Sequence, residues 1–553
     1  MGSQRFEMIF REPVPPVAGG YPGFKPTTEK KMGMVIERDV GAPMRDGATI
    51  YIDIFRPDRD GAFPALINWG PYGKFGRISH DARGNSGIED SDLNEYVAFE
   101  AGDPVYWCRN GYALINPDPR GTWNSDGDFT FSSHQEAEDC YDLIEWAAAQ
   151  EWSSGKVGMQ GVSYLAWSQW RVAALNPPHL AAINPWEGVS DFYREMAYHG
   201  GIPETHFRAL FQRGISFSRT RVENYEELAK AHPLFDDYWA SKNADLSKIT
   251  VPAFVVASWS DQGLHLRGTI EGFKQMVSKD KWLLVHGRKK WWHFYQKENV
   301  EKQRQFFNRF LKGIDNQVKQ WPRVTLEVRE RIYVGSIRTE REWPLARTQY
   351  TKLFLNAAAG KMGAAPFEKE ARAQYPVDDV SDKSQNAKFD FEFDKRTEIT
   401  GYMKLRLWVQ ADGSDDMDLF VAIEKVDRAG YLVPFVFFGN HDDGPVALGW
   451  LRVSHRELDE ERSTPYQPVH KHEREIKLKV GEIVPVDIEI WPSGTLYERG
   501  EKLRVVVQGS DIHAFPEESH TNEHTETVNR GVHIIHTGGK YDSHLLVPVI
   551  PDY

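Results

Sequence analysis

Ser163 stands in a segment whose residue types suit a nucleophilic serine. An apolar stretch typical of a strand, residues 156–160, precedes it, and a stretch compatible with a helix, residues 167–175, follows it. A serine on such a strand-to-helix turn has a strained backbone, so small residues have to stand beside it. Gly161 meets this need, whereas Leu165 occupies the position where the usual motif has its second glycine. Taken alone, the motif is equally compatible with an ordinary turn that ends in a helix-capping serine.

A nucleophilic serine needs a histidine that takes its proton and a carboxylate that holds the histidine in the right tautomer. Asp261 follows the apolar stretch of residues 253–258, and His293 follows the next such stretch, residues 281–286. Serine, aspartate, histidine is also the chain order in hydrolases that carry their serine on a strand-to-helix turn. We therefore expect Asp261 to orient His293, and His293 to act as the general base.

Two other residues compete for these roles. His286 ends the apolar stretch itself, where a buried imidazole with satisfied hydrogen bonds is more common than a mobile base. Asp191 is a weaker alternative to Asp261 as the orienting carboxylate. The pair of Asp261 and His293 remains the favoured interpretation.

Acyl transfer also needs hydrogen-bond donors directed at the oxyanion that forms during the reaction. One expected donor is the backbone N–H of Tyr164, the residue after the serine. The second has to come from an earlier loop, and Tyr72 stands in the loop directly after the apolar stretch of residues 64–68. Its phenolic hydroxyl could serve as this donor; the alternative for Tyr72 is an aromatic side chain on the rim of the site.

The surrounding sequence predicts a mostly parallel sheet that positions these residues. Residues 35–40 and 49–55 have the pattern of two strands joined by an Asp-Gly turn. Short apolar runs then alternate with helix-length stretches such as residues 136–150, as is typical of a parallel sheet. The expected strands are residues 64–68, 112–116, 156–160, 180–184, 253–258 and 281–286.

The strand pattern is interrupted once and is later replaced by another. Between residues 187 and 249 aromatic-rich segments have helical spacing, which predicts a helical cap inserted into the sheet domain. From about residue 348 onward, short alternating runs separated by turns predict a C-terminal β-sandwich. Its expected strands include residues 403–409, 418–423, 476–480, 484–490 and 503–507.

The length of the chain agrees with several domains. Its 553 residues exceed what one hydrophobic core usually serves. We expect an N-terminal arm (residues 1–24), an α/β domain that includes the cap (residues 25–345) and a β-sandwich domain (residues 346–553).

Composition indicates a folded protein and excludes several kinds of partner. Hydrophobic residues make up 41% and aromatic residues 13% of the chain, as in globular proteins. A formal net charge of −13 offers no basic surface for nucleic acid or anionic lipid. No secretory signal or long apolar span is visible, so we expect a cytoplasmic protein without membrane contact.

Cys108 and Cys140 lack the spacing of a metal or redox site and are expected to be free thiols.

Neither a metal nor a cofactor is expected. Histidines are frequent near the C-terminus, but their spacings match no zinc motif. Glycine-rich stretches lack the Lys-Ser/Thr pair of a phosphate-binding loop, and a serine mechanism requires no metal. The C-terminal histidines are His513, His520, His524, His533, His536 and His544.

Several motifs together resemble one family over nearly the whole chain. They are Met-Arg-Asp-Gly (44–47), Pro-Tyr-Gly-Lys (71–74), Asp-Pro-Arg-Gly-Thr (118–122), Ser-Asp-Gly-Asp-Phe (125–129) and Gly-Val-Ser-Tyr-Leu (161–165). On these motifs the sequence is similar to the X-Pro dipeptidyl-peptidase and CocE/NonD hydrolases, which include cocaine esterases, α-amino-acid ester hydrolases and glutaryl acylases. The resemblance implies an α/β-hydrolase core followed by a jelly-roll domain.

The resemblance also implies roles for single residues. It makes Ser163 the nucleophile and Tyr72 a donor to the oxyanion, and it favours Asp261 and His293 as the other two members of the triad. One segment departs from the family, in which a Gly-Pro-Trp-type segment with a small residue usually precedes the histidine. Here Gly-Arg-Lys-Lys-Trp-Trp (287–292) precedes His293, so the neighbourhood of the expected base is bulkier and more cationic.

The sequence thus predicts a serine hydrolase that cleaves an ester or amide of a small molecule with an apolar or aromatic group. An esterase is favoured over an X-Pro dipeptidyl-peptidase, because the peptidase needs an anionic site for a free amino terminus and the sequence offers no candidate. An acylase, an acyltransferase or a C–C bond hydrolase would use the same triad. A catalytically inactive hydrolase scaffold is the alternative from a different class. The sequence leaves a homo-oligomer open.

Overall fold

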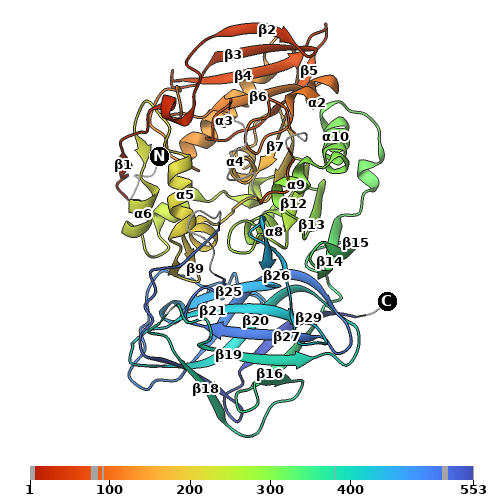
Figure 1. Ribbon diagram of the computed structural model, residues 1–553. Helices are drawn as coiled ribbons and strands as arrows, with labels where there is room; N and C mark the ends of the chain where they lie inside the picture. The colour runs from red at the N-terminus through yellow and green to blue at the C-terminus, as the bar shows by residue number, and fades with distance from the viewer. Residues whose placement is uncertain (1–5, 76–84, 90–92, 380, 514–520, 552–553) are drawn as a thin grey trace.

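The chain folds into two stacked parts, an N-terminal part built around a sheet covered by helices and a C-terminal part built of strands (Figure 1). The computed structural model describes residues 6–75, 85–89, 93–379, 381–513 and 521–551. The C-terminal histidine His520 lies outside these residues.

The central sheet of the N-terminal part is parallel over most of its width. Neighbouring strands run parallel from β6 to β14, and antiparallel strands extend both edges. The predicted hairpin and the six predicted strands all lie in this sheet. In spatial order its strands are β2 (Thr27–Lys31), β3 (Met34–Pro43), β4 (Thr49–Pro57), β6 (Ala113–Asp118), β5 (Phe63–Ile67), β7 (Ser153–Val162), β8 (Leu180–Trp186), β12 (Ala253–Ser258), β13 (Lys281–His286), β14 (Val324–Arg331) and β15 (Val334–Glu340).

Helices cover both faces of this sheet, which explains why its strands are apolar on both sides. Along β12, Val255 and Ala257 belong to one core, whereas Phe254 and Val256 belong to the other. The first core includes side chains of α3 (His134–Ala148), α4 (Tyr164–Ala173) and α8 (Leu266–Gln275). The second includes side chains of α2 (Pro104–Arg109), α9 (Lys290–Tyr295) and α10 (Lys297–Leu311).

Helix α3 shows how the sequence produces these elements. The Ser133 side chain accepts a hydrogen bond from the backbone N–H of Glu136 at 3.0 Å, which caps the first turn. Cys140, Leu143 and Ile144 recur at helical spacing and are buried against the sheet. Cys140 and Cys108 are both buried free thiols, as the sequence predicts.

The segment between β8 and β12 contains helices and a few short strands. Its helices are α5 (His206–Gly214), α6 (Tyr225–Ala231) and α7 (Asp237–Lys242). The N-terminal arm packs against it, because β1 (Phe10–Arg11) pairs with β11 (Val222–Glu223). A second pair of two-residue strands joins β9 (Tyr198–His199) to β10 (Ile202–Pro203). The sequence did not predict these short strands, because two residues are too few to show an alternating pattern.

The C-terminal part consists of two groups of antiparallel strands around a shared core. In one group β25 (Ala447–Arg452), β21 (Asp418–Val426), β27 (Lys502–Gln508) and β19 (Asn386–Glu392) lie side by side. The other is centred on β20 (Thr397–Asp412), which pairs with β26 (Val484–Tyr497) on one side. Its other edge pairs with β28 (Val532–Thr537) and β29 (His544–Ile550), which pair in turn with β18 (Ala371–Pro376) and β16 (Gln349–Asn356). Shorter strands are β17 (Lys361–Gly363), β22 (Leu432–Val433), β23 (Phe435–Phe437) and β24 (His441–Gly444).

One predicted strand of this part is wrong. Residues 476–480 form no strand. The Ile476 N–H donates to the Ser454 carbonyl in a short 3-10 helix, and the Leu478 N–H donates to the Asp415 carbonyl in a loop, so the two groups do not bond to one neighbouring strand. The alternating pattern there reflects Leu478 entering the shared core from a loop.

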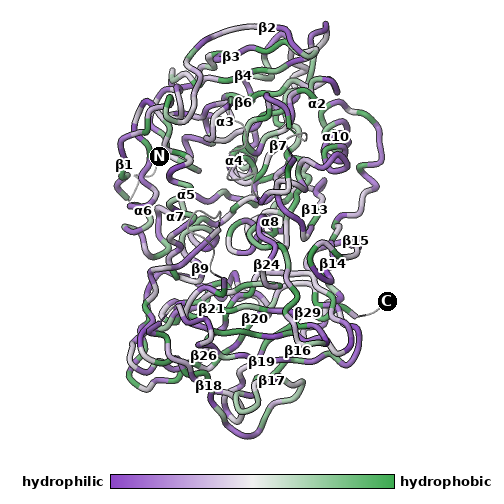
Figure 2. Tube along the Cα trace, viewed as in Figure 1, coloured by the Kyte–Doolittle hydropathy of each residue, from purple (hydrophilic) through white to green (hydrophobic). Residues whose placement is uncertain are grey.

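Apolar and polar residues are intermixed along the described part of the chain (Figure 2). Within the described residues, no helix combines the length and the apolar character that are needed to cross a membrane.

Candidate active site

Ser163 occupies a strained turn between β7 and α4. Its backbone has φ 59° and ψ −115°, a region that non-glycine residues rarely adopt. The Ser163 N–H donates to the carbonyl oxygens of Trp186 and Glu187 at 3.0 and 3.1 Å, which ties the turn to the end of β8. This is the geometry expected of a nucleophile elbow, and a helix-capping role is absent because the Ser163 side chain makes no capping hydrogen bond.

Leu165 fits beside this turn because two glycines face it. A Cβ atom on Gly161 would lie 2.4 Å from Leu165 Cβ, and a Cβ atom on Gly70 would lie 2.3 Å from Leu165 Cδ1. Gly161 also has φ +136°, which disfavours any other residue there. The departure from the usual glycine after the serine is therefore compensated by the absence of side chains opposite Leu165.

The histidine that contacts Ser163 is His265. Its Nε2 lies 3.1 Å from Ser163 Oγ, and its Nδ1 lies 2.6 Å from Asp261 Oδ2. Because an ionised carboxylate only accepts hydrogen bonds, Nδ1 carries the proton and Nε2 is free to accept one from the serine hydroxyl. The side chains of Asp261 and His265 are fully buried, and Ser163 is 6% exposed. The three residues thus form a continuous chain of hydrogen bonds.

His293 does not take the expected place beside Asp261. Its ring lies 3.9 Å from the ring of His286 and 6.0 Å from that of Trp186, measured between centroids, and its Nδ1 has no hydrogen-bond partner. The reason is that α9 begins only four residues after β13 ends and carries His293 away from Asp261. At the start of this helix it is Lys290 that reaches the carboxylate.

The two competing residues also have other partners. His286 Nε2 lies 3.2 Å from Glu187 Oε1 inside the protein. Asp191 pairs with Arg194, whose Nη1 donates to Asp191 Oδ2 at 2.7 Å. The structure therefore brings Ser163 and Asp261 together as expected and adds His265, which sequence reasoning missed. The signal for it was local, because Asp261 and His265 are four residues apart in the loop that leads from β12 into α8.

Lys290 is the third group in contact with this Asp–His pair. Its Nζ lies 3.1 Å from Asp261 Oδ2 and 3.2 Å from His265 Nδ1. Burial alone would raise the pKa of Asp261, but His265 and Lys290 hold it well below its usual range. Burial is the main cause that lowers the pKa of His265 to about 4; Asp261 opposes this shift and the Lys290 charge adds to it. At neutral pH Asp261 is therefore ionised and His265 is neutral.

Two more carboxyl groups lie in the same buried region. Burial raises the pKa of Glu100 to about 8, and its Oε1 accepts a hydrogen bond from Trp291 Nε1 at 3.0 Å. Burial, and then the charge of Asp261, raises the pKa of Glu187 well above its usual range. Both carboxyl groups are therefore largely protonated at neutral pH, because Lys290 alone cannot balance three buried negative charges.

The rings of the two tyrosines that are expected to supply the oxyanion donors pack against one another. The Tyr164 backbone N–H is at the start of α4, directly after Ser163, and the Tyr164 hydroxyl donates to Glu136 Oε1 at 2.7 Å. The Tyr72 ring packs edge-on against the Tyr164 ring with 6.0 Å between centroids, and Tyr72 is partly exposed. Burial, and then the charge of Glu100, raises the pKa of Tyr72 well above its usual range, so its hydroxyl remains a donor at neutral pH.

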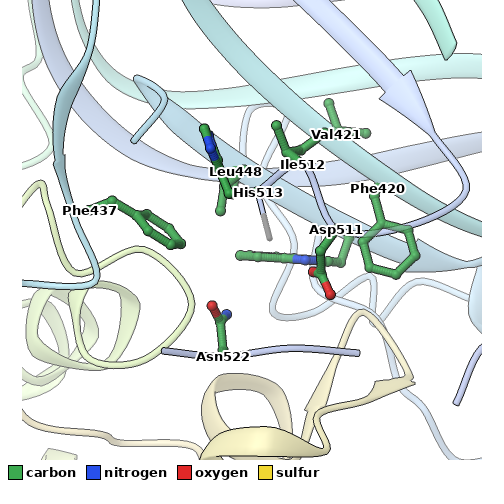
Figure 3. A pocket seen from close by; sticks show the side chains of 9 residues that line it. Phe420, Val421, Phe437, Leu448, Asp511, Ile512, His513 and Asn522 are labelled. Atoms are coloured by element: carbon green, nitrogen blue, oxygen red, sulfur yellow. The ribbon is translucent and has the colours of Figure 1, made fainter. Parts of the chain in front are cut away.

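The C-terminal part contacts the loop that carries Asp261 and His265. The Gly439 carbonyl accepts from the Lys290 N–H at 2.9 Å, and Asn522 packs against Gly263 so closely that a Cβ there would lie 2.1 Å from Asn522 Nδ2. Figure 3 shows Asn522 and Phe437 pointing into a small pocket between these contacts and the strands. Its volume is about 10 Å³, which suits a single water molecule rather than a substrate.

The described residues contain no group of three or more histidine, cysteine, aspartate or glutamate side chains that could hold a metal ion. The C-terminal histidines within them are engaged in other contacts. His524 Nδ1, for example, lies 2.8 Å from Asp511 Oδ1, and His533 Nε2 lies 3.0 Å from Asn529 Oδ1.

Two family models match the chain, one for each part. The model of the X-Pro dipeptidyl-peptidase (S15 family) matches residues 46–217 and 208–295. The model of the X-Pro dipeptidyl-peptidase C-terminal non-catalytic domain matches residues 316–546. Together they agree with the family that the sequence motifs suggest.

Individual relatives extend over nearly the whole chain. A crystal structure of a CocE/NonD family hydrolase from Staphylococcus aureus is 46% identical, covers 94% of each chain and has a TM-score of 0.90. A cocaine esterase from Rhodococcus sp. (strain MB1 Bresler) is 25% identical over 93% of this chain and 98% of its own length. An α-amino acid ester hydrolase structure, 16% identical with a TM-score of 0.70, covers 96% of this chain and 99% of its own and shares the fold. The protein therefore belongs to the CocE/NonD family of hydrolases and has an α/β-hydrolase domain followed by a C-terminal domain.

Proposed function

We propose that this protein is a serine esterase that hydrolyses small-molecule esters through an acyl-enzyme. Ser163 Oγ attacks the ester carbonyl carbon while its proton moves to His265 Nε2. The tetrahedral intermediate collapses, the C–O bond to the alcohol breaks, and His265 returns the proton to the leaving oxygen. Water then attacks the acyl carbonyl carbon while His265 takes one of its protons. The C–O bond to Ser163 breaks, His265 returns the proton to Ser163 Oγ, and the acid is released.

The observation that carries this proposal is the hydrogen-bond chain from Ser163 through His265 to Asp261 on a strained turn. Each contact has the length that proton transfer requires, 3.1 Å and 2.6 Å. The positive φ of Ser163 costs about 1–3 kcal/mol of stability, and such strained backbone positions are retained mainly at functional sites. An inactive scaffold would have no reason to keep either feature.

Tyr72 and the Tyr164 backbone N–H are the proposed oxyanion donors. Their positions support this proposal. Tyr72 lies in the loop after β5, and Tyr164 is the first residue of α4, directly after Ser163. Both donors keep their protons at neutral pH and are held by surrounding aromatic side chains. They would stabilise the negative charge that develops on the carbonyl oxygen during the attack.

An apolar or aromatic group on the substrate is favoured by the rings that surround the site. Trp167 packs against His265 with 6.3 Å between centroids, and Phe211 of α5 stacks on Tyr164 at 6.3 Å. Phe207 of α5 contacts Phe438 of the C-terminal part at 5.8 Å. We interpret residues 187–249 as a cap over the site and the C-terminal part as a jelly roll, so that aromatic residues from three regions enclose the substrate.

Cleavage after an X-Pro pair is less well supported. Such a peptidase needs a carboxylate for the free amino terminus of its substrate. Within the described ranges, the carboxyl groups around the triad are committed, since Asp261 pairs with His265 and Lys290. Glu100 and Glu187 are buried and their pKa values are raised, which makes both unsuitable for an ammonium group at neutral pH.

Hydrolysis of a panel of p-nitrophenyl esters, together with an X-Pro anilide, tests this function. The intact protein should hydrolyse short-chain or aromatic esters faster than the anilide, and Ser163→Ala should abolish the ester turnover. Labelling with a fluorophosphonate probe is run in parallel, because an activated serine reacts with it whatever the substrate. Absence of both turnover and labelling would favour the inactive scaffold, and preferred cleavage of the anilide would favour the peptidase.

A further inference from the structure

Lys290 occupies a place in the site that the reaction described above does not explain. It is the first residue of α9, it is 1% exposed, and its backbone N–H is held by the Gly439 carbonyl of the C-terminal part. A fully buried lysine is costly unless its charge is matched by a specific partner. Its ammonium group meets that condition, since it lies 3.1 Å from Asp261 Oδ2 and 3.2 Å from His265 Nδ1.

The titratable groups around the Asp261–His265 pair come from four elements of the N-terminal part. Asp261 lies in the same loop as His265, and Lys290 is the first residue of α9. Glu187 directly follows β8, and Glu100 lies in the loop before α2. Of these four groups only Lys290 is positive. The charge of Asp261 adds to burial in raising the pKa of Glu187, so the Glu187 carboxyl binds a proton more readily than Asp261 does.

These contacts have opposite consequences for the two members of the pair. The ammonium group donates to Asp261 Oδ2, which favours the ionised carboxylate that the His265 Nδ1 proton requires. The same charge, 3.2 Å from His265 Nδ1, opposes a second proton on the imidazole. Without the ammonium, Asp261 would lie beside two buried carboxyl groups with no cation, and both Asp261 and His265 would bind protons more readily.

We propose that Lys290 is a positioning residue that keeps Asp261 ionised and His265 neutral, so that Ser163 stays activated well into the acidic range. The residue acts through the Asp261–His265 pair and does not itself touch the substrate. The proposal rests on the function proposed above, in which His265 is the base.

The test compares the rate of Ser163 labelling by a fluorophosphonate across pH 3–9 in the unaltered protein and three variants. Labelling reports on the activated serine without any assumption about the natural substrate. Lys290→Met removes the charge and keeps most of the side-chain volume, and Lys290→Arg keeps the charge. The matched control is Lys289→Met, because Lys289 is adjacent in the chain but pairs with Asp442 at 3.0 Å on the other side of the loop.

The pH at which labelling is half-maximal should rise by about one unit or more in Lys290→Met and stay unchanged in Lys289→Met. Lys290→Arg should keep the acid limb of the wild type even if its rate is lower. A Lys290→Met variant that is slower at every pH with an unmoved acid limb would overturn the proposal, because this is the behaviour of a residue that only packs. Lys290→Gln, carried through the same series, gives the same readout if the methionine variant does not fold.

The outcomes also separate this proposal from the proposed function. Labelling of the wild type with no shift in Lys290→Met or Lys290→Gln leaves Ser163 as the nucleophile and overturns only the role of Lys290. A wild-type protein that is not labelled at any pH overturns both.

Discussion

Asp261 and His265 lie four residues apart in a single loop, and Asp261 Oδ2 accepts a 2.6 Å hydrogen bond from His265 Nδ1. The proposed carboxylate and the proposed base therefore come from the same loop rather than from the ends of two neighbouring strands. Their relative position is fixed locally, since the Leu266 N–H donates to the Asp261 carbonyl and Thr269 Oγ1 donates to the His265 carbonyl. The segment after β13, which would otherwise carry the base, contributes Lys290 instead.

Removing the carboxylate should disable this pair without unfolding the protein. In Asp261→Asn the amide can no longer hold the Nδ1 proton of His265, so we expect kcat for a p-nitrophenyl ester to fall by about 10⁴-fold with KM nearly unchanged. Steady-state kinetics measures both constants. Asp191→Asn is the control, because Asp191 is also buried and acidic but pairs with Arg194, and its kcat should stay within about tenfold of the wild type. A larger loss in the control than in Asp261→Asn would count against the assignment.

The enzyme should lose activity only at an unusually low pH. His265 has to be neutral to accept the serine proton, and burial lowers its pKa to about 4 from an ordinary value near 6.5. Activity is therefore complete above the folded-state pKa and is lost as the pH falls through about 4. The measurement is kcat/KM of an uncharged ester from pH 3 to 8, with circular dichroism to show that the protein stays folded. A limb near pH 6.5 would show that the imidazole is not held neutral in this way.

Loss of the Tyr72 hydroxyl should affect the rate rather than substrate binding. Tyr72→Phe removes one of two oxyanion donors and is expected to lower kcat by about 10²- to 10³-fold with little change in KM. Tyr225→Phe is a suitable control, since Tyr225 is buried in α6 and its hydroxyl has no hydrogen-bond partner. If Tyr72→Phe raised KM and left kcat unchanged, Tyr72 would be a residue of the rim of the site.

The space beside Leu165 can be tested by a double-mutant cycle. Gly70→Ala places a methyl group 2.3 Å from Leu165 Cδ1, so we expect it to lower the free energy of unfolding by about 1–3 kcal/mol. Leu165→Ala removes the atom that clashes. The double variant should therefore lose less stability than the sum of the two single variants, as measured by urea unfolding. Strict additivity would mean that the two residues do not compete for this space.

The sequence was informative where physical constraints act over short distances. Strands β12 and β13 begin and end where the apolar runs do, and the Gly161–Ser163 turn has the strained backbone that its motif predicts. It was less informative where distant segments decide the outcome. His293 follows a strand as a base should, yet its orientation depends on where α9 begins, and that depends on Gly439 of the C-terminal part holding the Lys290 N–H.

His265 could not be preferred from the sequence for a similar reason. A histidine that precedes an amphipathic helix by one residue is usually part of the helix start, and only the packing of α8 beside α4 brings it to Ser163. The residues 476–480 show the converse, since an alternating pattern there arises from a loop whose apolar side chains enter a core formed by other strands.

The most direct test of this account is kcat/KM for a p-nitrophenyl ester in His265→Ala compared with His293→Ala. His265→Ala should lower kcat/KM by at least about 10³-fold, because it removes the imidazole nitrogen that lies 3.1 Å from Ser163 Oγ and takes its proton. His293→Ala should remain within about tenfold of the wild type, because His293 faces His286 and Trp186 rather than the serine. The reverse result, with His293→Ala inactive and His265→Ala active, would contradict the assignment of the base and with it the proposed triad.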